Sequence, residues 1–184
     1  MMPASRFLLM LAPLTLLLAC DSPPTGAESA VAPRPGSILA DRFDNSEWSE
    51  PVNLGSVVNS DANEGHANLS PDAHELYFIS NRPGGVGGND IWVSHRTCLQ
   101  CPWETPVNLG TPVNTSTNEG GPTPSDNGRL LFYYSGIPGG QGGTDIYMSQ
   151  RISTGADGDV WGDPVNLGPD MNTTVDEQGR ITCE

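Results

Sequence analysis

The chain has 184 residues, and its 8 basic residues stand against 22 acidic ones, for a formal net charge of −14 at pH 7. Nucleic acid and anionic lipid headgroups are therefore poor partners, because like charges repel. Cations or a basic protein surface are electrostatically possible, although an acidic surface also simply keeps a protein soluble.

Residues 1–19 are typical of a processing segment. Arg6 precedes an apolar run from Phe7 to Leu18, which is shorter than the roughly 20 apolar residues of a membrane span. The run ends in Leu17-Leu18-Ala19-Cys20, which resembles the lipobox of bacterial lipoproteins. This resemblance implies lipidation of Cys20 and a place in the bacterial cell envelope, facing the periplasm or the cell surface. A plain cleaved signal peptide is the alternative.

Residues 20–41 are rich in Pro, Ala, Ser and Gly. This composition predicts a flexible tether between the anchor and a folded domain.

A repeat occupies the remainder, residues 42–184. Residues 51–96 and 106–151 align without a gap, and 22 of their 46 positions are identical. A third copy begins at Pro164 with the same Pro-Val-Asn-Leu-Gly. A period of this length indicates units that bury their faces against their neighbours.

Each complete unit contains four short apolar stretches that are bounded by Gly, Pro, Asn or Asp, which predicts four strands. The predicted ranges are 65–70, 75–80, 90–95 and 103–109 in the first unit, and 120–125, 130–135, 145–150 and 161–167 in the second. Single strands at 48–54 and 178–183 are expected on either side.

The first unit also carries a family resemblance. Leu69-Ser-Pro-Asp-Ala-His-Glu-Leu-Tyr-Phe-Ile-Ser-Asn-Arg-Pro-Gly-Gly, followed by Asn89-Asp-Ile-Trp, resembles the WD-repeat-like β-propeller unit of TolB-type envelope proteins. The second unit departs from that pattern, with Ile137 at the position of Arg82.

The resemblance implies an all-β fold, an incomplete β-propeller of two four-stranded antiparallel blades (about 65–109 and 120–167) with flanking single strands and a partial third unit at 168–184. Two blades leave apolar faces open, whereas propellers close with about 4–8 blades. We therefore expect a fragment, a truncated relative, or a chain that covers these faces by self-association.

Two cysteines, Cys98 and Cys101, lie in one short loop. A disulfide across the loop is favoured over a redox or zinc site, because the neighbouring sequence predicts strand and turn and too few further ligands are near. Pro102 stands where a c-type haem would need a histidine.

The repeated polar residues gather in loops that the propeller arrangement places on one face. The candidate binding-face residues are Asn63, Glu64, Arg82, Asp90, Asn118, Glu119, Asp145 and Glu177. One interpretation is that they hold the loops by hydrogen bonds, once in each unit. The other is an acidic rim for a cation, a sugar or a basic peptide.

No nucleophile elbow, phosphate loop or zinc-protease motif occurs in the sequence. Asp157, Asp159 and Asp163 only partly match a calcium loop. We expect no catalytic residue, cofactor or metal, and a non-catalytic binding or scaffold module whose partner is an envelope protein or glycan. A glycoside hydrolase, which needs two facing carboxylates, or a calcium-assisted glycan binder is the alternative.

We predict that Cys20 is acylated and that the protein fractionates with membranes, because two or more acyl chains give stable anchoring. Mass spectrometry of the mature N-terminus measures this directly. An unmodified Cys20, or cleavage at another bond, would contradict the prediction.

Overall fold

The computed structural model describes residues 50–155 and 158–178. The predicted lipobox, the tether and nearly all of the strand predicted at 178–183 lie outside these ranges. The described part is all-β: it forms two antiparallel sheets and contains no helix, so no helix in it could cross a membrane.

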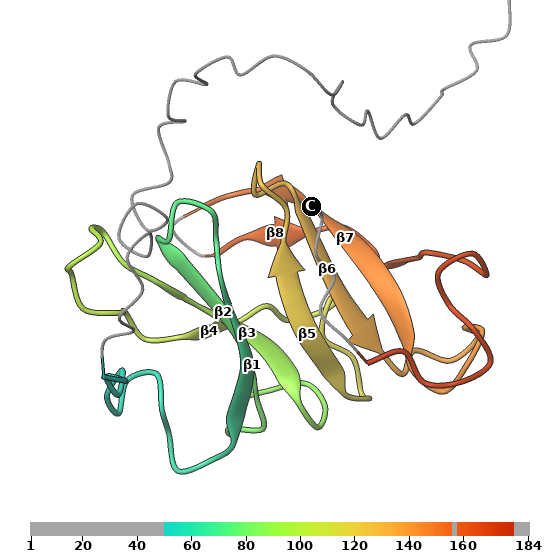
Figure 1. The fold of residues 1–184 in the computed structure, drawn as a ribbon, viewed down its shortest axis with the longest axis horizontal. Helices are drawn as coiled ribbons and strands as arrows, with labels where there is room; N and C mark the ends of the chain where they lie inside the picture. Colours follow the sequence, from blue (N-terminus) through green and yellow to red (C-terminus); the bar gives the residue numbers. More distant parts are fainter. Residues whose placement is uncertain (1–49, 156–157, 179–184) are drawn as a thin grey trace, which may run out of the picture. The chain divides into compact units, whose positions relative to one another are not determined.

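The first sheet, sheet A, contains four strands in chain order (Figure 1). These are β1 (Glu64–Leu69), β2 (Glu75–Ser80), β3 (Asp90–His95) and β4 (Val107–Asn108). A tight turn joins β1 to β2, and the Gly-rich loop at 81–89 joins β2 to β3, as the Ser-Pro-Asp and Pro-Gly motifs predict. The predicted fourth strand at 103–109 is reduced to two residues.

The second sheet, sheet B, has five strands rather than the predicted four. These are β5 (Glu119–Pro124), β6 (Leu130–Ser135), β7 (Asp145–Ser153), β8 (Val160–Trp161) and β9 (Val165–Asn166). The stretch predicted as one strand at 161–167 is divided between β8 and β9. Both pair with β7, which continues three residues beyond its predicted end.

The loop after the third strand explains the extra strand. In sheet A a disulfide between Cys98 and Cys101 closes this loop soon after β3 ends. In sheet B the loop is three residues longer and has no cysteine. β7 can therefore extend and form a small hairpin, in which Arg151 lies opposite Trp161 and Ser153 opposite Val160.

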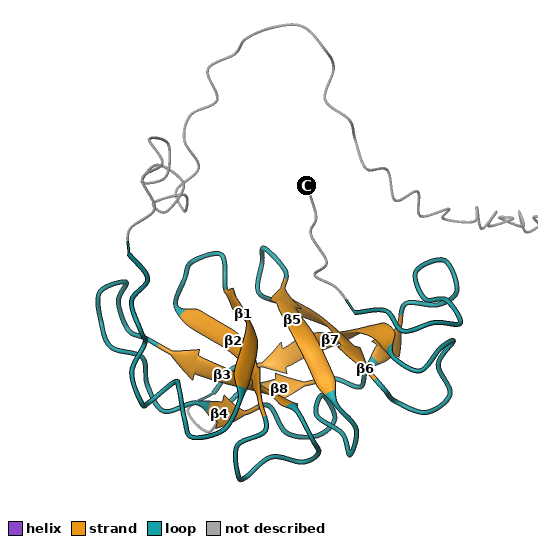
Figure 2. Ribbon diagram, turned by 60° about the horizontal axis from the view of Figure 1, so that its bottom comes forward, coloured by secondary structure: helices purple, strands orange, loops and turns teal. Residues whose placement is uncertain are grey.

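The main core lies between the sheets, where β5 packs against β1, β2 and β3 (Figure 2). Side chains alternate along a strand, so β2 sends Tyr77 and Ile79 toward sheet B while Leu76 and Phe78 point to the other face of sheet A. The residues buried between the sheets are Tyr77, Ile91, Val93, Val113, Leu131, Tyr133, Tyr147 and Trp161.

A smaller cluster closes the outer face of sheet A. Leu76, Phe78 and Trp92 are all buried there and pack with Val58. The guanidinium of Arg82 lies 5.0 Å from the Phe78 ring centroid and 5.2 Å from that of Trp92. An arginine in this position covers aromatic surface while its own charge stays paired.

The turns between the first two strands of each unit require a positive φ. Gly128 supplies it in the second unit with φ 65°, but Ala73 occupies the matching position in the first unit with φ 58°. A left-handed conformation costs a residue with a Cβ about 1 kcal/mol. A hydrogen bond from Ala73 N to Ser70 O closes this turn, at 2.8 Å.

The Gly-rich loop that precedes β3 docks onto the segment before β5. Gly88 N donates to Thr117 O at 3.0 Å, and Glu119 N donates to Asn89 O at 2.8 Å. This approach leaves no room for a side chain at Gly87, where a Cβ would lie 2.2 Å from Thr115 O. The glycine is therefore required for the contact between the two units.

We predict that Gly87→Ala lowers the free energy of unfolding by about 1–3 kcal/mol, because the obstacle is backbone and the loop must move. Gly65→Ala is the matched control, since its Cβ would meet nothing closer than 3.8 Å. Thermal and urea unfolding of both variants measures the difference. Equal loss of stability in the two would contradict the docking role of the loop.

Candidate functional site

A three-residue polar network joins the outer strand of sheet A to its Gly-rich loop. The buried Asp90 carboxylate accepts hydrogen bonds from Val86 N and from Gly87 N, and a third from Asn108 Nδ2 at 3.0 Å. The Asn108 side chain in turn accepts from Asn114 Nδ2 at 2.9 Å. Each of these groups therefore has partners within the protein.

Asn114 extends this network to the backbone of β3. Its Oδ1 accepts from Ile91 N at 2.8 Å, and its Nδ2 donates to Ile91 O at 2.9 Å. A side-chain amide that bonds both groups of one residue acts as a short additional strand. The segment between the sheets is thus fixed to sheet A before it enters sheet B.

Sheet B repeats the network residue for residue. Asp145 accepts from Gln141 N, Gly142 N and Asn166 Nδ2, and Asn172 bonds both backbone groups of Ile146. The first copy of the motif is incomplete. Asn59 donates to Asn53 Oδ1 at 3.0 Å as its counterparts do, but no aspartate among the described residues joins them.

The repeated glutamates hold the loops that begin β1 and β5. Glu64 accepts from Ser60, from Ser80 Oγ at 2.9 Å and from Arg82 at 3.0 Å. Burial opposes ionisation of Glu64, but the hydrogen bonds from Ser60, Ser80 and Arg82 outweigh it and lower the pKa of this carboxyl.

Glu119 occupies the equivalent position in the second unit, and its pKa is shifted the other way. Burial raises it, and the hydrogen bonds from Thr115 and Ser135 compensate only in part. The side chain is 1% exposed, and Ile137 stands where Arg82 supports Glu64. The environment of Glu64 in the first unit therefore stabilises the ionised carboxylate, whereas that of Glu119 in the second unit disfavours it.

Most of the candidate binding-face residues are consequently turned toward the protein itself. Asp90, Asp145 and Glu119 are buried, and Arg82, Glu64 and Glu177 are partly buried. Only Asn63 and Asn118 are exposed, and Asn118 Oδ1 accepts from Asn89 N at 2.8 Å. The structure brings the predicted loops together, but their polar groups mainly satisfy one another and the backbone.

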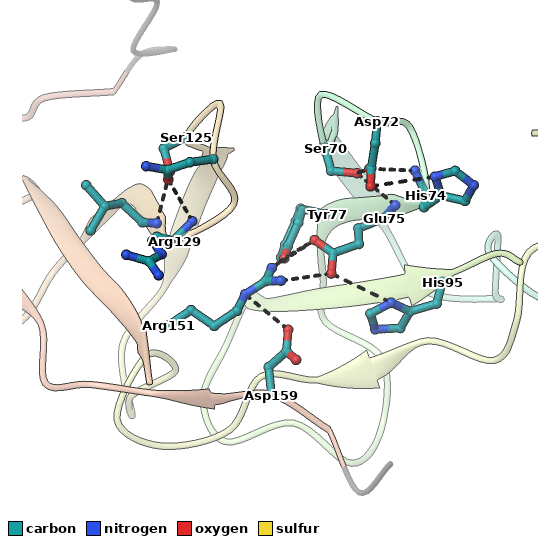
Figure 3. A network of polar contacts seen from close by, with 12 residues as sticks. Ser70, Asp72, His74, Glu75, Tyr77, His95, Ser125, Arg129, Arg151 and Asp159 are labelled. Atoms are coloured by element: carbon teal, nitrogen blue, oxygen red, sulfur yellow. Dashed lines mark hydrogen bonds and ion pairs between the residues drawn. The ribbon is translucent and has the colours of Figure 1, made fainter. Parts of the chain in front are cut away.

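A second polar cluster, which does not repeat, bridges the two sheets (Figure 3). Arg151 of β7 donates to both carboxylate oxygens of Glu75 in β2, at 3.0 and 2.8 Å, and to the hydroxyl of Tyr77. Its Nε lies 3.3 Å from Asp159 Oδ2. His95 Nδ1 completes the cluster at 3.9 Å from Glu75 Oε1.

The surroundings of this cluster are largely dry. The side chains of Arg151, Glu75 and Asp159 are 12%, 16% and 6% exposed, and the Arg151 guanidinium stacks over the Trp161 ring at 4.9 Å. Burial raises the pKa of Asp159, and the charge of Arg151 counters part of this rise. Burial and the Glu75 carboxylate also raise the pKa of Tyr77, which keeps its phenol protonated.

This cluster was not predicted from the sequence, because Glu75, His95 and Asp159 lie outside the repeated polar positions. The available signal was the departure from the repeat: Glu75 aligns with Leu130, and His95 aligns with Gln150. The sequence around Asp159 only partly matches a calcium loop, and in the structure Asp159 pairs with Arg151. Among the described residues no group of three or more His, Cys, Asp or Glu side chains could hold a metal ion.

Comparison of the chain with models of protein families, with curated proteins and with solved structures gives no match. The likeness to WD-repeat-like envelope proteins therefore rests on the sequence motifs alone.

We predict that Arg151→Met destabilises the protein by about 3 kcal/mol at neutral pH, because it leaves two poorly solvated carboxylates without their partner. Without Arg151 the pKa of Asp159 rises further. Because the pKa of Asp159 is higher in the folded than in the unfolded protein, ionisation of this carboxyl lowers the free energy of unfolding. This loss is absent at low pH and grows as the pH rises through the pKa of the folded state. The deficit relative to the wild type should therefore be smaller near pH 4 than at pH 7.

Arg96→Met is the matched control for this measurement. Arg96 is the repeat equivalent of Arg151 and stacks over Trp103 at 4.4 Å, but it donates to the carbonyls of Ala73 and Leu99 instead of carboxylates. The loss of stability caused by Arg96→Met should therefore change little with pH. Parallel pH dependences in unfolding experiments on the two variants would refute the ion-pair account.

Proposed function

We propose that this chain is a non-catalytic binding or scaffold module of the bacterial cell envelope, lipid-anchored through Cys20 and built from WD-repeat-like β-propeller repeats. The observation that carries the proposal is that the repeated polar residues form hydrogen bonds within the protein itself. The Asp90 and Asp145 networks each tie an outer strand, a Gly-rich loop and the following segment together. Such residues build a rigid platform and leave few groups for chemistry.

The arrangement of the sheets agrees with propeller repeats. In each sheet the strands lie side by side in chain order, beginning at β1 in sheet A and at β5 in sheet B. The segment after each outer strand leads into the next unit. The two units also share a bulge near the start of their first strand, at residues 65–68 and 120–123. Equivalent irregularities at equivalent positions indicate one structural unit used twice.

The lipobox and the tether supply the location in this proposal. A tether of the kind predicted from the composition of residues 20–41 would let the domain sample a volume above the membrane instead of one fixed pose. An acidic domain is also repelled by an anionic membrane surface. The module would therefore face away from the bilayer, toward an envelope protein or a glycan.

A carbohydrate-active enzyme is the competing function, and the Glu75–Arg151–Asp159 cluster is the observation in its favour. It contains two carboxylates, and Asp159 has a raised pKa, as a general acid requires. Against this, Arg151 occupies both oxygens of Glu75 and also contacts Asp159. A substrate would have to displace a guanidinium that is mostly buried.

We expect the full chain to co-sediment with purified peptidoglycan sacculi or with envelope protein, and to release no soluble sugar from sacculi. Glu75→Gln and Asp159→Asn should leave binding unchanged, since the cluster is structural in this proposal. Binding is measured by pelleting and hydrolysis by reducing-end release. Sugar release that Glu75→Gln abolishes would overturn the non-catalytic function in favour of the enzyme.

A further inference from the structure

The turn between β5 and β6 contains the one Asn-Gly pair of the sequence, Asn127-Gly128. Asn127 is exposed, and Gly128 has a φ of 65°. In such a pair the backbone nitrogen of the glycine can attack the side-chain carbonyl carbon of the asparagine, because a glycine has no Cβ to obstruct the approach. The pair is therefore open to a spontaneous modification, deamidation, whose rate depends on the conformation of the turn.

The folded turn opposes this reaction with three hydrogen bonds. Gly128 N, the attacking atom, donates to Ser125 O at 2.8 Å. Asn127 Oδ1 accepts from Ser125 Oγ at 2.9 Å and from Arg129 N at 3.0 Å. Attack requires the Gly128 nitrogen to lose its proton and to meet the carbon that bears Oδ1. Both steps need these bonds to break first, so the reaction requires local opening of the turn.

The matching turn of sheet A shows which product the fold accepts (Figure 3). Asp72 stands at the position of Asn127, and its Oδ1 accepts from Ser70 Oγ at 2.6 Å and from His74 N at 3.1 Å. The hydrogen bond from Ser70 lowers the pKa of Asp72 against the effect of burial. An aspartate in this turn thus makes the same contacts as the asparagine does.

We propose that Asn127 is a deamidation site that the folded turn protects, and that the fold retains the aspartyl product but not the isoaspartyl one. The Gly128 nitrogen bonds to the side-chain carbonyl carbon of Asn127 and loses its proton, and ammonia leaves, which forms a cyclic imide. Water then opens the ring. Cleavage of the new bond gives aspartate, whereas cleavage of the original peptide bond gives isoaspartate, whose main chain is one carbon longer.

The longer main chain of isoaspartate does not fit between the two strands. The turn is closed by the bond from Gly128 N to Ser125 O, and just beyond it Pro124 lies opposite Leu131. An added backbone carbon displaces the Gly128 nitrogen and with it this register. Because a shift of register moves side chains out of the core, we expect the isoaspartyl form to lose the β5–β6 pairing. This modification needs no bound partner, so it is independent of the proposed function.

The test uses the full chain in a neutral detergent and compares folded protein with protein unfolded in urea, both in the same mildly alkaline buffer. Peptide mapping by mass spectrometry measures the loss of Asn127, and an isoaspartyl methyltransferase labels the second product. We expect the loss to be at least about 10-fold slower in the folded protein, because only the opened turn reacts. Equal rates in the two states, or no reaction in urea, would overturn the proposal.

Two serine variants test whether this turn supplies the protection. Ser125→Ala removes one hydrogen bond to the Asn127 side chain, so it should accelerate the reaction in the folded protein and leave the rate in urea unchanged. Ser70→Ala is the matched control, because Ser70 has the same place in the turn of sheet A. It should leave the rate at Asn127 unchanged. Equal acceleration by both would refute protection by this turn.

The two products are tested separately. Asn127→Asp makes the aspartyl product by mutation, and its midpoint of urea unfolding should equal that of the wild type. A clear decrease would overturn the claim that the fold retains this product. Wild-type protein aged in urea and then refolded should carry its isoaspartate in the protease-sensitive fraction. Isoaspartate divided equally between the resistant and sensitive fractions would show that the fold accepts both products, against the proposal.

Discussion

The buried aspartate at the start of the third strand is the constraint on which each unit depends. Asp90 and Asp145 are 1% and 2% exposed, and a carboxylate removed from water must be supplied with hydrogen bonds. The Gly-rich loop supplies two backbone N–H donors, and an asparagine of the outer strand supplies the third. The loop can curl around the carboxylate because Gly85 has no Cβ; a Cβ at this position would lie 2.0 Å from Asp90 Oδ2.

This constraint extends to the next unit through a second asparagine. Asn108 is held by Asp90, Asn114 is held by Asn108, and Asn114 then pairs with the backbone of Ile91. Loss of the Asn114 side chain would leave Ile91 N without its acceptor, and loss of the Asp90 carboxylate would leave Asn108 Nδ2 without its own, so the members of the network depend on one another. The outer strand, although only two residues long, is held in place because the Asn108 side chain donates to Asp90 and accepts from Asn114.

Departures from the repeat give each sheet a separate role. Arg82 closes sheet A's outer face and stabilises the charge of Glu64, whereas Ile137 joins the core between the sheets. Arg96 and Arg151 both stack on a tryptophan, but only Arg151 meets a carboxylate from the other sheet. The repeated residues therefore build the unit, and the others determine how it joins its neighbours and what its ends expose.

The sequence by itself determined the first three strands of each unit and the turns between them. Apolar stretches bounded by Gly and Pro predicted nearly all of the first and last residues of the first three strands of each unit to within about one residue, because these signals are local. It also brought Cys98 and Cys101 into one loop, where the structure has a disulfide. The outer strands were less well predicted, because a strand of only two paired residues has almost no sequence pattern and β8 depends on the length of the preceding loop. The prediction of a strand at 48–54 was wrong for its described part, since residues 50–54 form no strand.

Only the tertiary structure decided which polar residues are available. A repeated Asp or Glu looks the same in sequence whether it faces solvent or is buried against the backbone of its own loop, as Asp90 is against Val86 N and Gly87 N. The pair Glu75–Arg151 joins residues 76 positions apart in different units, and no spacing rule connects them. Phe132, Ile146 and Met148 of sheet B likewise repeat the pattern of Tyr77, Ile91 and Val93 of sheet A, yet among the described residues only the sheet A set is fully buried, because the pattern records which side chains a strand can bury and not what packs against them.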